Sequence, residues 1–97
     1  MADYVVLFRF THEGISHLKD SPQRIKEAKQ IIEKSGAKVK SVYAVFGQYD
    51  TVWIIEAPND ETMARISLQL ASRGSVIAET LRAFNESEYL NIVEKAL

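Results

Sequence analysis

The stretch from residue 39 to residue 57 reads VKSVYAVFGQYDTVWIIEA. Its two ends, Val39–Phe46 and Thr51–Ala57, are rich in β-branched and aromatic residues, a composition typical of strands. The segment Gly47–Asp50 between them has turn composition, so the two strands are predicted to pair as an antiparallel hairpin. In that turn, Gly47 is expected to supply an unusual φ angle and Asp50 to accept hydrogen bonds from backbone N–H groups.

Each side of this hairpin is predicted to add one strand and one helix. Apolar residues recur at helical spacing between a proline near the start of each helix and a glycine at its end. The predicted segments are a strand at Tyr4–Phe10, a helix from Ser21-Pro22 to Gly36, a helix from Pro58 to Gly74 and a strand at Val76–Phe84, with residues 11–20 as a connection or short helical turn. Ser21 is predicted to be the N-cap of the first helix. The βαββαβ order predicts an α+β, ferredoxin-like fold, with both helices on one face of a four-stranded antiparallel sheet.

An extra helix is predicted at the C-terminal end. Asn85 and Glu88 have the spacing of a capping box, in which each side chain accepts a backbone N–H from the other residue. The apolar residues that follow at helical spacing are Tyr89, Leu90, Val93 and Leu97. Residues 1–97 are expected to form a single domain, because a chain of this length suits one modest core.

The predicted strands carry apolar side chains at both parities. Val5 and Leu7 alternate with Tyr4, Val6 and Phe8, and a similar two-sided pattern recurs in the two hairpin strands. A sheet with one solvated face should instead alternate apolar and polar residues. The face without helices therefore needs a cover, and a second copy of the chain is the simplest one. We expect a homodimer of two sheets stacked face to face, or a higher multiple.

Charge and composition limit the remaining partners. Lys and Arg number 12 against 13 Asp and Glu, so the formal net charge is −1. Nucleic-acid binding needs a basic surface that neutralises phosphates, and no nucleic-acid partner is expected. The absence of cysteine excludes disulfides and thiolate sites and favours a cytoplasmic location. No membrane association is expected, because the longest apolar run, Tyr4–Phe8, is far shorter than a bilayer span.

Four blocks of the sequence resemble the GYD-domain family, which is named for a Gly-(x)-Tyr-Asp signature. They are Lys19–Arg24, Gly47–Asp50, Ile55–Asp60 and Ala78–Phe84, and the resemblance extends to about Glu88. The resemblance implies a ferredoxin-like, dimeric α/β-barrel protein, in agreement with the order of the segments. Members of this family are largely of unassigned function, so the resemblance indicates the fold more than the activity.

The first functional hypothesis is a homo-oligomeric module that binds a small molecule at or near the subunit interface. The candidate ligand-binding residues are Tyr43, Tyr49, Asp50, Trp53, Thr80 and Arg82. Arginine suits bidentate recognition of a carboxylate, so Arg82, with Thr80, is the candidate to bind a ligand carboxylate. The alternative reading of the charged strand residues Arg9, Glu56, Glu79 and Arg82 is a network of ion pairs, since buried charges must pair.

Two further hypotheses remain open. Other barrels that share this fold include cofactor-light oxygenases, haem-handling enzymes and isomerases, and such an activity would need a histidine as acid–base group or haem ligand. His12 and His17 are the only histidines, and their spacing of five residues does not place them on one helix face as a metal pair. No cofactor and no metal are expected, no catalytic residue is assigned, and an enzyme is the less favoured reading. The third hypothesis is a purely structural assembly module.

Overall fold

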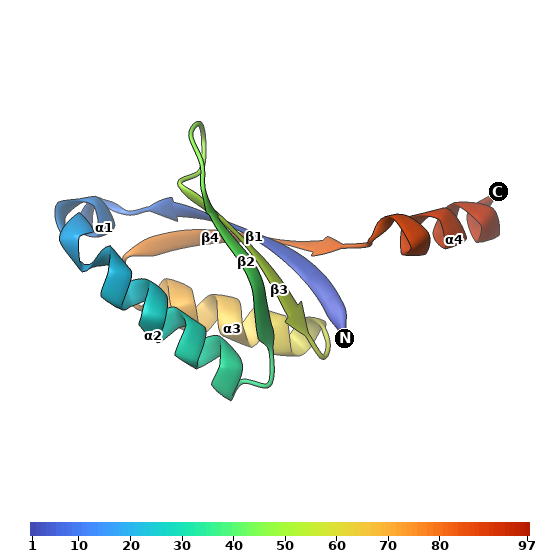
Figure 1. The fold of residues 1–97 in the computed structure, drawn as a ribbon, viewed down its shortest axis with the longest axis horizontal. Coiled ribbons are helices and arrows are strands. Elements are labelled where there is room, and N and C mark those ends of the chain that lie inside the picture. The colour runs from blue at the N-terminus through green and yellow to red at the C-terminus, as the bar shows by residue number, and fades with distance from the viewer.

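The computed structural model describes residues 1–97 and has the predicted α+β architecture (Figure 1). The strands are β1 (Ala2–Phe10), β2 (Lys38–Ala44), β3 (Thr51–Ala57) and β4 (Val76–Ala83); the helices are α1 (His12–Ser16), α2 (Ser21–Lys34), α3 (Asp60–Ser72) and α4 (Glu86–Ala96), with a 3₁₀ turn, η1 (Leu18–Asp20), before α2. All strand pairs are antiparallel, and the strand order across the sheet is β2-β3-β1-β4. This order and the βαββαβ connectivity make the fold ferredoxin-like, as predicted.

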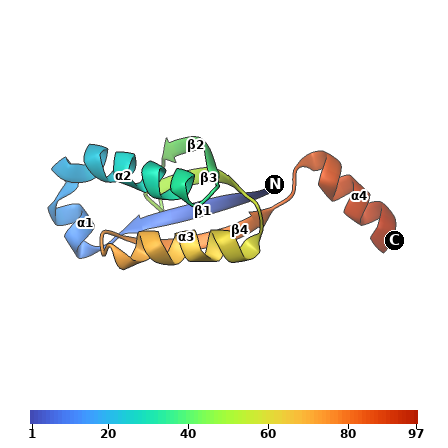
Figure 2. The same cartoon turned by 90° about the horizontal axis from the view of Figure 1, so that it is seen from below.

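Helices α2 and α3 cover one face of the sheet (Figure 2), and the core lies between these helices and that face. β1 contributes its even-numbered residues Tyr4, Val6 and Phe8, and β3 its odd-numbered residues from Trp53 to Ala57. The helices contribute buried side chains at helical spacing, namely Ile32 from α2 and Met63, Ile66 and Leu70 from α3. Burial of these side chains is the main stabilising contribution to the fold.

Two predicted boundaries are wrong for local reasons. Ser21 is not an N-cap, because η1 continues directly into α2 and gives Ser21 helical angles of φ −54° and ψ −44°. The second strand ends at Ala44 and not at Phe46, because a backbone hydrogen bond from Val45 to Asp50 closes the hairpin loop just beyond the pair Ala44–Thr51. Phe46 therefore lies fully exposed in the loop.

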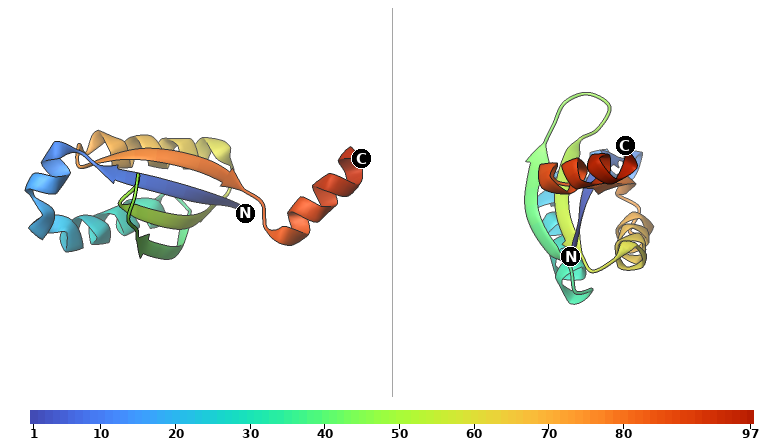
Figure 3. Two further views of the ribbon diagram at one scale, coloured as in Figure 1. Left: turned by 90° about the horizontal axis from the view of Figure 1, so that it is seen from above. Right: turned by 90° about the vertical axis from the view of Figure 1, so that its right-hand side faces the viewer.

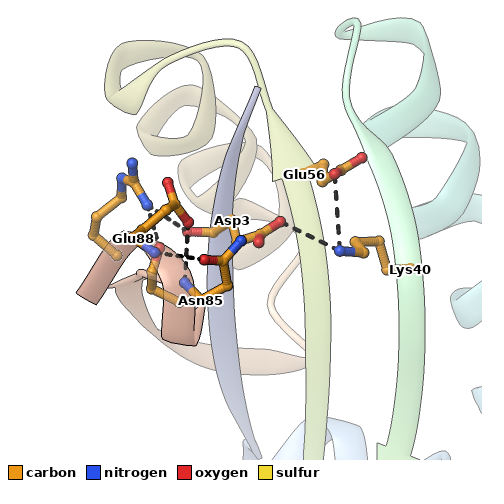
Figure 4. Close-up of polar contacts among 7 residues, drawn as sticks. Asp3, Lys40, Glu56, Asn85 and Glu88 are labelled. Carbon is orange, nitrogen blue, oxygen red and sulfur yellow. Dashed lines mark hydrogen bonds and ion pairs between the residues drawn. The ribbon is translucent and has the colours of Figure 1, made fainter. Parts of the chain in front are cut away.

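The predicted helix ends are confirmed. Gly36 and Gly74 both have φ of +87°, a conformation that favours glycine after the last turn of a helix. At the start of α4, the side chain of Asn85 accepts the N–H of Glu88, and the side chain of Glu88 accepts the N–H of Asn85 (Figure 4). The predicted capping box is therefore present.

The other face of the sheet has no helix over it, as the left view of Figure 3 shows. The apolar side chains on this open face are Val5, Leu7, Tyr43, Val52, Ile54, Ile77 and Leu81. Tyr43, Ile77 and Leu81 are exposed, with 59%, 58% and 45% of their surfaces accessible. Helix α4 extends away from the sheet, and none of its residues is buried (Figure 1). The chain by itself thus has an open sheet and not a closed barrel.

Candidate functional site

The sheet separates the residues that the sequence suggested as one ligand site. Trp53, Thr80 and Arg82 point to the helix-covered face, while Tyr43 lies on the open face. Tyr49 also belongs to the open face, because its hydroxyl contacts Glu79 there. The structure therefore brings together neither Tyr43 with Trp53 nor Tyr49 with Arg82.

The hairpin loop is positioned by Gly47 and Asp50. Gly47 has φ of +111°, which a residue with a side chain rarely adopts. The carboxylate of Asp50 accepts the backbone N–H of Phe10 at 2.8 Å, and the Asp50 N–H donates to the carbonyl of Phe8 at 2.8 Å. Asp50 thus fixes the loop to the end of β1 through two hydrogen bonds. Its carboxylate accepts a backbone N–H, as the sequence predicted for this turn residue.

The loop between β2 and β3 rises above the sheet (Figure 1), and Tyr49 in this loop contacts Glu79 and Arg9 at one end of the open face. Its hydroxyl donates a 2.8 Å hydrogen bond to Glu79, and the guanidinium of Arg9 lies 5.7 Å from its ring centre. Hydrogen bonding to Glu79 raises the pKa of Tyr49, with smaller contributions from desolvation and the charge of Glu79. Arg9 forms no ion pair with a carboxylate.

The opposite end of the open face carries a cluster of charged residues. The ammonium of Lys40 lies 3.6 Å from Asp3 and 3.8 Å from Glu56, as Figure 4 shows. Lys40 occupies the irregular position of β2 between Val39 and Ser41, which breaks the register of the strand pair. The open face therefore has an apolar middle and a polar cluster at each end.

Arg82 and Thr80 line a groove between β4 and α3. Arg82 lies over the ring of Phe84 at 4.4 Å and over that of Tyr4 at 5.6 Å, and its Nε is 3.9 Å from Asp60 Oδ1. The hydroxyl of Thr80 forms a 2.7 Å hydrogen bond with that of Ser67 on α3. Arg82 is therefore already engaged by aromatic rings and a carboxylate, and Thr80 by a hydroxyl, so this pair is held as part of the β4–α3 packing.

Trp53 lines a different cavity, one that the sequence did not indicate. Its indole ring packs edge-on against Phe8, with ring centres 5.7 Å apart. The cavity has a volume of about 60 Å³ and lies between the sheet and the segment from α1 to α2. Its polar lining residues are Ser21, Arg24, Thr51, Arg73 and Ser75. They come from separate segments of the chain, so no local motif could have identified them.

Both histidines are exposed and line neither the Trp53 cavity nor the β4–α3 groove. His12 begins α1, and the Nδ1 of His17 lies 3.1 Å from the carbonyl of Glu13 one turn earlier. A general base must lie within hydrogen-bond reach of its substrate, so neither histidine supports an enzyme site in these two places. None of the helices is both long and apolar enough to cross a membrane.

Comparisons with known proteins agree with this fold. The family model described as the GYD domain matches residues 4–93. A protein of Thermus thermophilus named glutamine synthetase and cystathionine beta-lyase binding protein is 45% identical over 84 residues, which are 86% of this chain and 88% of that protein. The crystal structure of TTHA0845, also from Thermus thermophilus, has a TM-score of 0.57 at 26% identity, and the match covers 88% of this chain and 95% of that one. The family model spans nearly the whole chain, and the chain therefore belongs to the GYD domain family.

Proposed function

We propose that this protein is a self-associating adaptor that binds other proteins, with metabolic enzymes as its partners. The relative of 45% identity is named for binding glutamine synthetase and cystathionine β-lyase, and these two enzymes are the first candidates. The observation that carries the proposal is the amount of apolar surface that the chain leaves accessible. Contiguous apolar patches on a folded domain mark protein interaction sites.

Self-association is assigned to the open face of the sheet. The apolar middle of this face includes Leu7, Val52 and Ile54, and two stacked sheets would bury these side chains between them. The polar ends would then form the rim of the interface. Arg9 has no carboxylate partner within its own chain, which leaves it available to a carboxylate of a second copy. Stacking of this kind would close the open sheet into the dimeric α/β barrel.

Helix α4 is assigned to contacts beyond the open face. Tyr89 and Leu90 are each 58% exposed and Ile92 is 42% exposed, although all three belong to a regular, well-capped helix. A helix of this length is marginal in water without a packing partner. Its apolar side chains therefore suit docking against another subunit or against an enzyme partner.

The predicted small ligand between subunits stays a prediction. Tyr43 and Tyr49 both belong to the open face, and in a stacked dimer they would lie at its interface. The enzyme alternative is less favoured, because the two histidines are exposed on α1 and immediately after it.

Sedimentation velocity tests the self-association. Ile54→Glu places a carboxylate in the apolar middle of the open face, and we expect it to convert a dimer or higher multiple into a monomer. Leu68→Glu is the matched control, because Leu68 is 71% exposed on α3, away from the open face. The assignment is wrong if the wild-type protein sediments as a monomer, or if both variants dissociate equally.

Surface plasmon resonance tests the enzyme partners. Purified glutamine synthetase and cystathionine β-lyase from the same organism would be immobilised beside an unrelated enzyme of similar charge. We expect saturable binding to at least one of the two enzymes and none to the unrelated one. Equal or absent responses on all three surfaces would contradict the proposed partners.

A further inference from the structure

The cavity beside Trp53 has an apolar floor and walls. The rings of Phe8, Phe10 and Trp53 come from the helix-covered side of β1 and β3. Ile25 of α2 and Leu70 of α3 lie across from the sheet and complete the apolar lining. With a volume of about 60 Å³, the space suits a small molecule, whereas a docked helix has a diameter of roughly 10 Å.

The cavity is also lined by two arginines that differ in their partners. Arg73 forms an ion pair with Glu27, so its charge is already matched. Arg24 forms no ion pair and donates one hydrogen bond, from Nη1 to the carbonyl of Gly14 at 3.3 Å. A guanidinium carries five N–H groups, so most of those on Arg24 have no acceptor within the chain. The cavity is therefore lined by one half-buried arginine whose charge has no counter-ion within the chain.

Three hydroxyl groups add to this polar side of the cavity. Ser21, Thr51 and Ser75 all line it, and no buried side-chain oxygen or nitrogen of the chain lacks a hydrogen-bond partner, so any unbonded hydroxyl among the three is accessible to solvent. Hydroxyls donate and accept, and they can hydrogen-bond the oxygens of an anion that an arginine binds. A single unmatched guanidinium beside hydroxyls suits a monoanion with planar, paired oxygens, which is a carboxylate.

We propose that this cavity binds a small monocarboxylate, whose charged group contacts Arg24 and whose short apolar body lies against the aromatic floor. The site belongs to one chain and lies on the helix-covered side of the sheet, opposite the face assigned to self-association. It is a second binding function beside the proposed contact with proteins. The two proposals use different residues, so each can fail without the other.

Trp53 provides a built-in reporter, because it is the only tryptophan and it lines the cavity. The probe is sodium butyrate, titrated at constant ionic strength against sodium chloride while the emission of Trp53 is recorded. Butyramide is the neutral control of the same shape. We expect a saturable change with butyrate, and a response to butyramide and chloride that is absent or at least about tenfold weaker.

Arg24→Gln tests the charged contact. This variant removes the positive charge, and we expect butyrate to bind about tenfold more weakly or not at all. Arg65→Gln is the matched control, because Arg65 is exposed on α3 and does not line the cavity, and it should bind butyrate as the wild type does. Thr51→Val, which keeps the side-chain shape and removes one hydroxyl, should weaken binding by a smaller factor of about three to ten.

Circular dichroism and thermal melting of each variant establish that it is folded before the titration. The proposal is overturned if butyrate and chloride give the same unsaturated response in the wild type. It is also overturned if folded Arg24→Gln binds butyrate as tightly as the wild type. If Arg24→Gln does not fold, two other comparisons test the proposal. It is then overturned if Thr51→Val binds butyrate as tightly as the wild type does, or if the wild type responds equally to butyrate and butyramide.

Discussion

The hydroxyl of Tyr4 in β1 donates a 2.5 Å hydrogen bond to the carboxylate of Asp60 in the first turn of α3. Arg82 of β4 lies against both groups, 5.6 Å above the Tyr4 ring and 3.9 Å from Asp60. The contact therefore joins three elements that are far apart in the sequence. Asp60 also lies at the positive end of the α3 dipole, which favours its negative charge.

Replacement of Tyr4 by phenylalanine should reduce stability. Tyr4→Phe removes the hydrogen bond to Asp60 without removing the buried ring, so we expect the free energy of unfolding at pH 7 to fall by about 1 kcal/mol. Urea denaturation measures this difference. Tyr43→Phe is the control, because Tyr43 is exposed and its hydroxyl forms no bond to a carboxylate, and it should change stability by less than about 0.5 kcal/mol.

The same tyrosine should make stability depend on alkaline pH. Burial, together with the hydrogen bond to Asp60 and the charge of Asp60, raises the pKa of Tyr4 from 10.0 to about 12. The folded state therefore holds the phenol proton more tightly than the unfolded chain does. This contribution to stability is complete below the unfolded pKa and is lost as the pH rises through the folded one. Between these two pH values, the stability of Tyr4→Phe should fall less steeply than that of the wild type, and parallel slopes would contradict the assignment.

Gly14 should tolerate no side chain, for steric reasons. A Cβ atom at Gly14 would lie 2.2 Å from the carbonyl oxygen of Ser75, and that oxygen already accepts the N–H of Thr11. The carbonyl oxygen of Ser75 is a backbone atom and cannot rotate out of the way as a side chain could, so α1 would have to move away from the start of β4. We expect Gly14→Ala to lower the free energy of unfolding by about 1–3 kcal/mol. Ser16→Ala on the exposed side of α1 should be nearly neutral, and an equal loss in both variants would mean that the close approach is unimportant.

The contact between Tyr49 and Glu79 should be visible in a spectroscopic titration. Glu79 raises the pKa of Tyr49 chiefly by accepting its hydroxyl proton in a hydrogen bond. Glu79→Gln replaces the carboxylate with a neutral and weaker acceptor and also removes the negative charge that opposes ionisation, so the pKa of Tyr49 should move down toward the ordinary value of 10.0. The absorbance of tyrosinate measures this shift. Glu61→Gln on α3 is the control and should leave the titration curve unchanged.

The capping box should decide how far α4 is formed in a chain that has no partner. Asn85→Ala removes the acceptor for the Glu88 N–H, a change that costs about 1 kcal/mol in helix stability. With no buried residue to compensate, we expect the far-ultraviolet helix signal to fall and the α4 amides to exchange faster. Ser87→Ala lies outside the box and should preserve the signal. Unchanged exchange in Asn85→Ala would indicate that packing, and not the cap, holds the helix.

The sequence was a good guide to elements that short-range chemistry defines. The glycines at positions 36 and 74, the turn at Gly47 and the capping box of Asn85 all depend on residues within a few positions of one another. The misplaced boundary at Ser21 had a similar local origin, since the 3₁₀ turn before it already supplied helical geometry. Such errors move the end of an element but leave the order of elements intact.

The candidate site was harder to predict, because it depends on which way the side chains of each strand point. Apolar residues occupy both parities of β1 and β3, so the local pattern is the same for either orientation. The sequence analysis places Tyr43 and Trp53 in one candidate ligand site, yet they lie on opposite sides of the sheet. The polar lining of the Trp53 cavity comes from residues as distant as Ser21 and Ser75, and no spacing in the sequence connects them.

The amino-acid sequence alone determined the type and order of the elements, the antiparallel hairpin and the ferredoxin-like connectivity, because propensity, caps and turn residues act within a few positions. The tertiary structure decided which side of the sheet each residue occupies. That choice follows from cross-strand register and from the packing of α2 and α3 against one face only. The same packing places Trp53 in a cavity with Arg24 and leaves Ile54 on the open face, where a second copy of the chain is proposed to bind.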